Sequence, residues 1–393
     1  MTSDTLSSKQ DRLVRLLGFL SHDRTNTMLL ADALNLAIET GDAANGKRLL
    51  EHLEQYPSDD PQLCALALHL ALQAHDFITA AAYGDKALKA GIEHPAVVYN
   101  AAFAHFYSGD YATTADLFAR HASAQDSSTA LLLHARALHH QELTEEAEPL
   151  VVQALEQEPQ STEARGLLAL LRYENDDLDS ALSLSREVLV HDPDQLDALI
   201  ACASAHFEQR AISASRNAWL HTVQAHPGCG RAWSGLGQLE FNELQFDQAL
   251  EHLRKAVELM PDHIGTWHLL AWIHILHNDS AAARDALLKS YELDRNFGET
   301  HGGLAVVDVM DGLEQEARFG IRRALKLNPD GLSARYAEML LLQRAGKVEQ
   351  AKELLHQVLA NTSPDGHNSG QVLLERWLHE HQDKRATARP DHH

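Results

Sequence analysis

The chain has 393 residues, of which 45% are hydrophobic and 23% charged, and its formal net charge is −23 at pH 7. This balance disfavours nucleic-acid binding, because phosphate contacts depend on clustered Lys and Arg and the sequence has no basic stripe. The chain also lacks any run of about 18 apolar residues, so we expect no membrane span. A conventional globule of this length would divide into domains, whereas a stack of repeats can absorb the length in one array.

Residues 1–26 are expected to form an N-terminal capping helix. An apolar stripe at helical spacing would cover the open end of the array that follows. The stripe consists of Leu6, Leu13, Leu16, Leu17 and Leu20. No basic stretch followed by an apolar one is present at the start, which argues against a cleaved secretion signal.

The three cysteines of the chain lie far apart and have no paired spacing. They are Cys64, Cys202 and Cys229. This pattern predicts neither a zinc knuckle nor a disulfide framework. We therefore expect a cytoplasmic protein, because thiols stay reduced in that compartment.

Small residues recur at intervals close to 34 residues along most of the chain. A period of this length, with helical patterning inside it, predicts stacked helical hairpins, because one hairpin cannot bury its own apolar face. The series runs through Gly46, Ala80, Thr114, Ala147, Ala181, Ser215, Ala249, Ala283, Ala317 and Ala351.

Residues 230–263 show the internal pattern of one repeat most clearly. Two apolar helical stripes flank a polar break at residues 242–245, and a proline follows the second stripe. Small residues stand where the two helices would cross, since close helix axes need small side chains. The defining residues are Trp233, Leu236, Gly237, Ala249, Ala256 and Pro261.

These residues resemble the signature of the tetratricopeptide repeat family. The resemblance implies an all-α fold, a right-handed superhelical α-solenoid of about ten helix-turn-helix repeats. The Trp position varies between repeats, and Arg295 replaces the closing proline in one of them. The expected repeats are residues 27–60, 61–94, 95–127, 128–161, 162–195, 196–229, 230–263, 264–297, 298–331 and 332–365.

The segment after the last repeat is expected to form a C-terminal capping helix at residues 366–382. Its apolar stripe contains Val372, Leu373, Trp377 and Leu378. Either terminal helix could instead provide a contact between two copies of the chain, so a homo-oligomer stays open. Residues 383–393 are expected to be a disordered tail.

The sequence offers no recognisable catalytic or cofactor-binding motif. There is no phosphate-binding loop and no nucleophile elbow. His274 and His277 are three residues apart on one helical face, but they have no third ligand. We therefore predict no enzyme, no cofactor and no metal. The 26 histidines leave a pH-sensing role open.

In the family that the chain resembles, the first helix of each pair lines a concave groove that binds a peptide. The resemblance implies a groove with aromatic and mixed polar side chains. Carried over position by position, it contains Tyr99, Phe103, Phe106, Tyr107, Arg136, His139, His140, Tyr173, Phe207, Arg231, Gln238, Phe241, Asn242, His268 and Trp272.

Tyr99, Phe103 and Tyr107 form the first hypothesis for the binding site. They recur on one helical face, whereas Val98 and Phe118 would supply the packed face. The alternative is that each aromatic side chain packs against the next repeat. A second site is conceivable near Gly235, Gly302 and Gly303, where either a ligand backbone or a close helix would explain glycine inside a helix.

The sequence thus favours a non-catalytic scaffold, adaptor or chaperone that binds a peptide segment of another protein. The acidic charge favours a basic partner, although the solubility of a large repeat surface also explains it. One alternative is a regulatory subunit or sensor that responds to a small ligand or pH. A third is an unrecognised enzyme.

Overall fold

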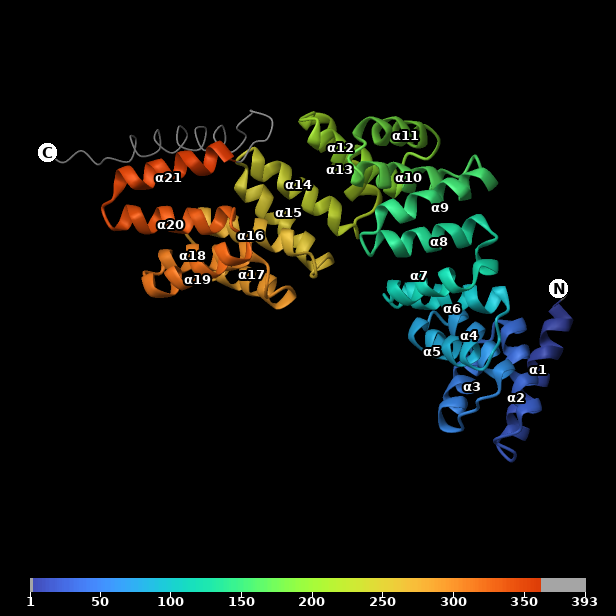
Figure 1. The fold of residues 1–393 in the computed structure, drawn as a ribbon. Coiled ribbons are helices and arrows are strands. Elements are labelled where there is room, and N and C mark those ends of the chain that lie inside the picture. Colours follow the sequence, from blue (N-terminus) through green and yellow to red (C-terminus); the bar gives the residue numbers. More distant parts are fainter. Residues whose placement is uncertain (1–2, 362–393) are drawn as a thin grey trace. The chain divides into compact units, whose positions relative to one another are not determined.

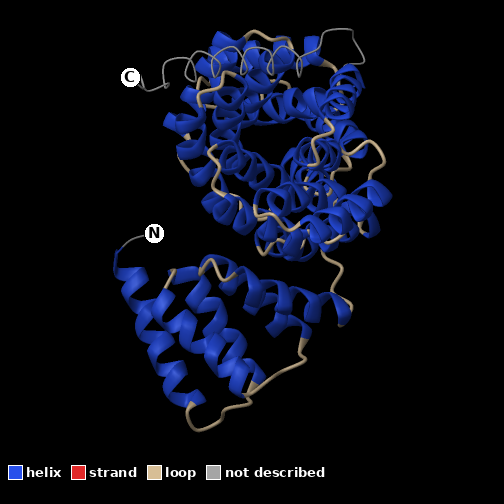
Figure 2. Cartoon of the chain, turned by 90° about the vertical axis from the view of Figure 1, so that its left-hand side faces the viewer, coloured by secondary structure: helices blue, strands red, loops and turns tan. Residues whose placement is uncertain are grey.

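The computed structural model describes residues 3–361 of the chain. Within this range the protein is all-helical and contains no strand (Figure 2). Contacts between Cα atoms divide the chain into two compact units, unit 1 at residues 1–201 and unit 2 at residues 202–393. The expected capping helix at 366–382 and tail at 383–393 lie outside the described residues.

Unit 1 begins with α1 (Ser3–Leu20) and continues as successive helical pairs (Figure 1). Leu13, Leu16 and Leu20 of α1 are buried, whereas the side chain of Leu6 lies outside the described part. The pairs are α2 (Thr27–Thr40) and α3 (Ala43–Gln55), α4 (Pro61–Gln73) and α5 (Phe77–Lys89), α6 (Pro95–Tyr107) and α7 (Tyr111–Arg120), α8 (Ser128–His139) and α9 (Thr144–Gln157), and α10 (Thr162–Glu174) and α11 (Leu178–His191). A short 3-10 helix, η1 (Ala122–Gln125), separates α7 from α8.

Helix α12 (Leu196–Glu208) starts in unit 1 and ends in unit 2. Unit 2 continues with α13 (Ile212–Ala225), α14 (Gly230–Asn242) and α15 (Phe246–Leu259), α16 (Ile264–Leu276) and α17 (Ser280–Leu293), α18 (Gly298–Met310) and α19 (Glu314–Leu327), and α20 (Leu332–Arg344) and α21 (Val348–Asn361). We propose that each pair is one repeat, which starts at its first helix.

Every pair turns from its first to its second helix through one residue with positive φ. Four of these residues are glycine, which adopts the left-handed region without steric cost, and six carry a side chain. In order, they are Gly41, His75, Gly109, Glu142, Asp176, Arg210, Leu244, Asn278, Gly312 and Gly346. The recurrence of this backbone conformation marks the repeat period independently of side-chain identity.

The recurring small residues lie buried where the two helices of a pair cross. Ala249 and Ala283 have no exposed surface. A Cβ added to Gly237 would lie 2.6 Å from Leu253 Cγ, which is closer than carbon atoms can approach. The contact between α14 and α15 therefore depends on the missing side chain.

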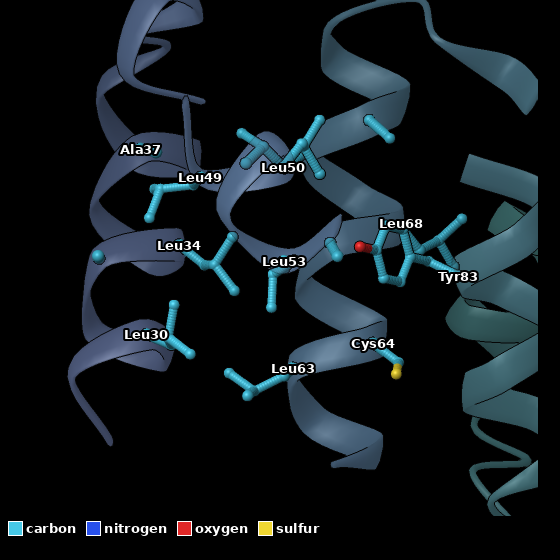
Figure 3. Packing of buried hydrophobic residues seen from close by; sticks show 14 of the residues in the cluster. Leu30, Leu34, Ala37, Leu49, Leu50, Leu53, Leu63, Cys64, Leu68 and Tyr83 are labelled. Atoms are coloured by element: carbon cyan, nitrogen blue, oxygen red, sulfur yellow. The ribbon is translucent and has the colours of Figure 1, made fainter. Parts of the chain in front are cut away.

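Leucine side chains from consecutive helices fill the interior between the pairs. Leu34 of α2, Leu49 and Leu53 of α3 and Leu63 of α4 are all at most 3% exposed. Figure 3 shows them pointing toward one another between the ribbons. Since each pair contributes one such layer, burial by the neighbouring pair stabilises every repeat.

In most repeats, the side chain at the variable Trp position makes the same hydrogen bond. Trp267 Nε1 donates to the carbonyl oxygen of Pro261, six residues earlier, at 2.8 Å. Trp233 makes the same six-residue link, and so do donors of other types: Cys64, Arg165, His301 and Arg335. Replacement of Trp by Cys, Arg or His therefore preserves the link between a first helix and the loop before it.

First helices of neighbouring pairs contact one another in both units. In unit 1 these contacts join α2 to α4, α4 to α6 and α6 to α8, and in unit 2 they join α14, α16, α18 and α20. Second helices contact mainly the first helices on either side of them. The first helices thus form one layer and the second helices another.

Candidate functional site

An aromatic stripe runs along α6 in unit 1. Tyr99, Phe103 and Tyr107 follow at four-residue intervals, and their ring centroids are 6.2 Å and 4.5 Å apart. Val98 on the opposite side of the helix is fully buried, whereas Tyr107 is 54% exposed. Tyr99 and Phe103 are half-buried and pack against the buried cluster that contains Val98 and Phe118, so Tyr107 is the most exposed member of the stripe.

Phe77, the first residue of α5, extends this stripe toward the preceding repeat. Its ring stacks on Tyr107 with the centroids 5.1 Å apart, and it lies 6.3 Å from Phe103. We call Phe77, Tyr99, Phe103 and Tyr107 the α6 aromatic face. Three of its members come from one helix, so the helix fixes their spacing.

A second aromatic group lies beside this face, between α6, α7 and α8. His140 stacks on Tyr111 with the ring centroids 4.1 Å apart and the planes nearly parallel at 5°. Phe106 contacts both rings edge-on, at 5.3 Å from Tyr111 and 5.7 Å from His140. These three residues connect successive repeats.

Ion pairs hold the polar residues predicted on α8. Arg136 Nη2 lies 2.9 Å from Asp197 Oδ2 and 3.3 Å from Glu163 Oε1. Burial alone would lower the pKa of Arg136, but Asp197 and Glu163 raise it, so the guanidinium stays charged. His139 Nε2 lies 2.8 Å from Glu174 Oε2.

The phenol of Tyr99 stays neutral over an extended pH range. Burial raises its pKa, and the neighbouring Tyr107 and Glu163 raise it further. Glu163 keeps 61% of its side chain exposed while it contacts Arg136. A carboxylate is thus available near the aromatic stripe.

Unit 2 presents its predicted residues in a different setting. Phe241 packs edge-on against Phe246, 5.6 Å away, and Phe246 in turn contacts His277. Gln238 is exposed, and Asn242 is half-buried. Tyr173 in unit 1 and Phe207 and Arg231 in unit 2 are also half-buried.

His268 and Trp272 lie one turn apart on α16 and contact different neighbours. His268 Nε2 is 2.9 Å from Thr300 Oγ1, which is 2.7 Å from Ser290 Oγ. Trp272 packs edge-on against Tyr336, with the ring centroids 5.5 Å apart. The side chains of these two predicted residues therefore join α16 to later helices.

Three aromatic residues contact the predicted site but were not among the residues predicted from the sequence. Tyr336 stands at the same place in its repeat as Tyr99, so the positional rule could have found it. Phe77 and Tyr111 each begin a second helix, and the rule considered first helices alone. Their contact with the first-helix aromatics arises from the turn between the two helices.

Neighbouring helices fill the space around the three glycines of the conceivable second site. A Cβ on Gly235 would lie 2.4 Å from Trp219, and one on Gly303 would lie 2.7 Å from Leu287. At Gly302 it would lie 2.6 Å from the backbone nitrogen of Ala334. Close helix packing explains these glycines, and no ligand needs to approach them.

Residues 3–361 contain neither a metal-binding cluster nor a membrane-spanning helix. In that range no three His, Cys, Asp or Glu side chains come together to hold a metal ion. Likewise, no helix in the described part is long and apolar enough to cross a bilayer.

The chain is similar to known repeat proteins. Two family models, both described as tetratricopeptide repeat, match residues 132–198 and 229–296 respectively. The CTR9 homolog of Arabidopsis thaliana is 29% identical over 140 residues, which cover 35% of this chain and 13% of that protein. The protein O-mannosyl-transferase TMTC3 of Homo sapiens is 28% identical over 120 residues, covering 30% of this chain and 13% of that protein. This chain thus matches a small part of either relative.

One solved structure resembles this chain over most of its length. A chain in the crystal structure of the APC/C hetero-tetramer Cut9-Hcn1 has a TM-score of 0.52 at 15% identity, covering 95% of this chain and 81% of that chain. At this identity the likeness shows the fold, an α-solenoid of helical repeats. The two family matches and the paired helices described above thus identify tetratricopeptide repeats in this chain at residues 132–198 and 229–296.

Proposed function

We propose that the protein is a non-catalytic interaction scaffold that binds a peptide segment of a partner protein on the α6 aromatic face. The observation that carries this proposal is the exposure of Tyr107, which ends an aromatic stripe on a first helix and has 54% of its surface accessible. Large rigid side chains provide contact area at a small cost in conformational entropy, which suits peptide recognition.

The position of the face within the repeats supports a peptide as the occupant. Three of its four residues lie on a first helix, in the layer whose helices contact one another in unit 1. Tetratricopeptide repeats generally bind other proteins, and the family resemblance places their peptides against first helices. An extended segment could therefore run from α4 across α6 to α8.

The charges near the face favour a basic side chain in the partner. Two carboxylates, Glu163 and Asp197, share the single guanidinium of Arg136. A Lys or Arg of the peptide could contact an exposed ring face and Glu163 together. We propose such a residue as the polar anchor of the segment.

We further propose a role as an adaptor or chaperone in the cytoplasm. The three cysteines support this location, since none of them forms a disulfide and Cys64 and Cys202 are buried. Thiols in this state suit a reducing compartment.

The experiment selects peptides from a random library with the full chain and measures their affinity by fluorescence anisotropy. Tyr107→Ala should weaken the selected peptides by about tenfold or more, because an aromatic anchor is removed. Phe19→Ala is the matched control, since Phe19 is also an exposed aromatic side chain but lies on α1, outside both proposed binding surfaces. Equal affinity for the wild type and Tyr107→Ala would contradict the proposal.

A further inference from the structure

Three successive second helices of unit 2 expose side chains at the same four positions of the repeat. Equivalent positions in successive helices are 34 residues apart. In α15 these places hold acidic and basic residues in balance, and in α17 an acid still stands at each end. In α19 both acids are absent. The sets are Glu251, Arg254, Lys255 and Glu258 in α15, Asp285, Leu288, Lys289 and Glu292 in α17, and Phe319, Arg322, Arg323 and Lys326 in α19.

Ion pairs in α15 and α17 show what α19 lacks. Lys255 Nζ lies 3.0 Å from Glu258, and Lys289 Nζ lies 2.8 Å from Glu292. The equivalent pair in α19 is Arg323 and Lys326, two cations one turn apart, which repel each other. Neither these two nor Arg322 forms an ion pair with any residue of the described range.

Phe319 supplies an apolar contact point among these cations. It stands where α15 and α17 carry an acidic residue, and it is 62% exposed. A shallow hollow of about 460 Å³ is lined by Phe319, Leu327 and the three basic side chains. Glu314 and Glu316 lie in the first turn of α19, so its cations are concentrated toward the C-terminal end.

We propose that this surface, the α19 basic face formed by Phe319, Arg322, Arg323 and Lys326, docks an acidic segment of a partner protein. The carboxylates of that segment would pair with the three cations, and an apolar side chain beside them would contact Phe319. The surface lies on a second helix of unit 2, so the inference is independent of the peptide site proposed on α6.

Charge complementarity selects this occupant over an extended polyanion. The chain carries a net charge of −23, so a nucleic acid or an anionic membrane would be repelled beyond the few turns of α19. A short acidic segment would contact only the cations of α19 and would not reach the region that repels a longer polyanion. The apolar contact at Phe319 and Leu327 also suits a peptide with a hydrophobic side chain.

The test measures binding of a fluorescent peptide, in which Asp and Glu alternate with Leu, to the full chain at about 0.15 M salt. Replacing Arg322 and Arg323 by Glu should weaken binding by about tenfold or more. The control replaces Arg254 and Lys255 by Glu, which makes the same change of charge at equivalent places of α15. It should leave the affinity within about twofold, and Phe319→Ala should weaken it by about fivefold.

Several results would overturn the inference. Equal weakening by both double variants would mean that only overall charge matters, and absence of binding to the wild type would remove the site. Duplex DNA or anionic phospholipid vesicles that bind more tightly than the peptide, with the same dependence on Arg322 and Arg323, would assign the surface to another ligand. Circular dichroism checks that each variant is folded, and all four substituted cations are exposed.

Discussion

Each unit has a group of two aromatic residues and a histidine at the turn between helices, but the two groups differ in their ring contacts and in what surrounds them. Unit 1 has Phe106, Tyr111 and His140, and unit 2 has Phe241, Phe246 and His277. In unit 1 the group continues along α6 into Phe103 and Tyr107. The equivalent places of α14 hold Gln238 and Asn242.

This difference separates aromatic residues that build the repeats from those that are additional to them. A group of this kind recurs in both units and connects successive repeats, so packing explains it. Phe103 and Tyr107 have no aromatic counterpart in α14, and Tyr107 is largely exposed. A role outside the fold is therefore best sought in the residues that α14 lacks.

The largest effect is expected from Phe118→Ala, which removes a fully buried side chain beneath the α6 aromatic face. The cavity should lower the free energy of unfolding by about 3–5 kcal/mol. Urea denaturation followed by circular dichroism measures the change. Leu253 occupies the same place in unit 2 and is also fully buried, so Leu253→Ala should cost about 2–5 kcal/mol. A loss below about 1 kcal/mol at Phe118 would show that this core differs from that of unit 2.

Gly302→Ala tests the close packing of unit 2. The new methyl group would meet the backbone of Ala334 and Ser333, so we expect a loss of about 1–3 kcal/mol. Gly18→Ala in α1 is the control, because no atom lies within 4 Å of its added Cβ. That substitution should stabilise the protein by about 0.5–1 kcal/mol through helix propensity. The melting temperatures of the two variants should therefore move in opposite directions.

The left-handed turn residues allow a comparison between equivalent places of the two units. Leu244 in unit 2 has a φ of 62°, whereas Gly109 occupies the same place in unit 1 with a φ of 87°. Leu244→Gly should relieve backbone strain and stabilise the protein by about 1 kcal/mol, and Gly109→Ala should destabilise it by about the same amount. Thermal unfolding of both variants measures the two shifts. A loss of stability in Leu244→Gly would mean that its side chain contributes more than the strain costs.

The smallest effect concerns pH and single buried histidines. Burial lowers the pKa of His134 in unit 1 and of His274 in unit 2, from an ordinary value of 6.5. The unfolded chain then binds more protons than the folded one, so stability is complete above about pH 6.5 and falls as the pH drops through the folded pKa. His134 stacks on Phe118, and its Nδ1 lies 2.9 Å from the side-chain oxygen of Gln125.

His134→Gln retains an amide donor for Gln125 but does not titrate. The drop in melting temperature between about pH 7.5 and pH 5.5 should therefore be smaller in this variant than in the wild type. Differential scanning fluorimetry at the two pH values measures it. An unchanged drop would mean that other groups carry the pH dependence.

Much of the fold could be predicted from the sequence because it repeats. The spacing of small residues indicated stacked helical hairpins, and the family resemblance identified the repeat type. The sequence did not reveal that the varied residues at the Trp position share one hydrogen bond, because Cys, Arg and His look like departures from the pattern. Each of these side chains bonds to a backbone carbonyl group six residues earlier. A pattern of side chains does not show such backbone partners.

The candidate site was harder to predict than the fold. Position in the repeat selected Phe103 and Tyr107 but equally selected Phe106 and His140, whose rings pack on Tyr111. The difference between these pairs depends on which second-helix aromatic lies nearby. That information is spatial, and the spacing of first-helix residues does not contain it.

The most direct measurement of the central claim combines affinity and stability in Phe103→Ala. This half-buried residue is the centre of the α6 aromatic face. The account predicts that a library-selected peptide binds about tenfold or more weakly to Phe103→Ala, while the free energy of unfolding falls by only about 1 kcal/mol. Unchanged affinity, with a stability loss as large as that of Phe118→Ala, would show that Phe103 belongs to the core and would contradict the account.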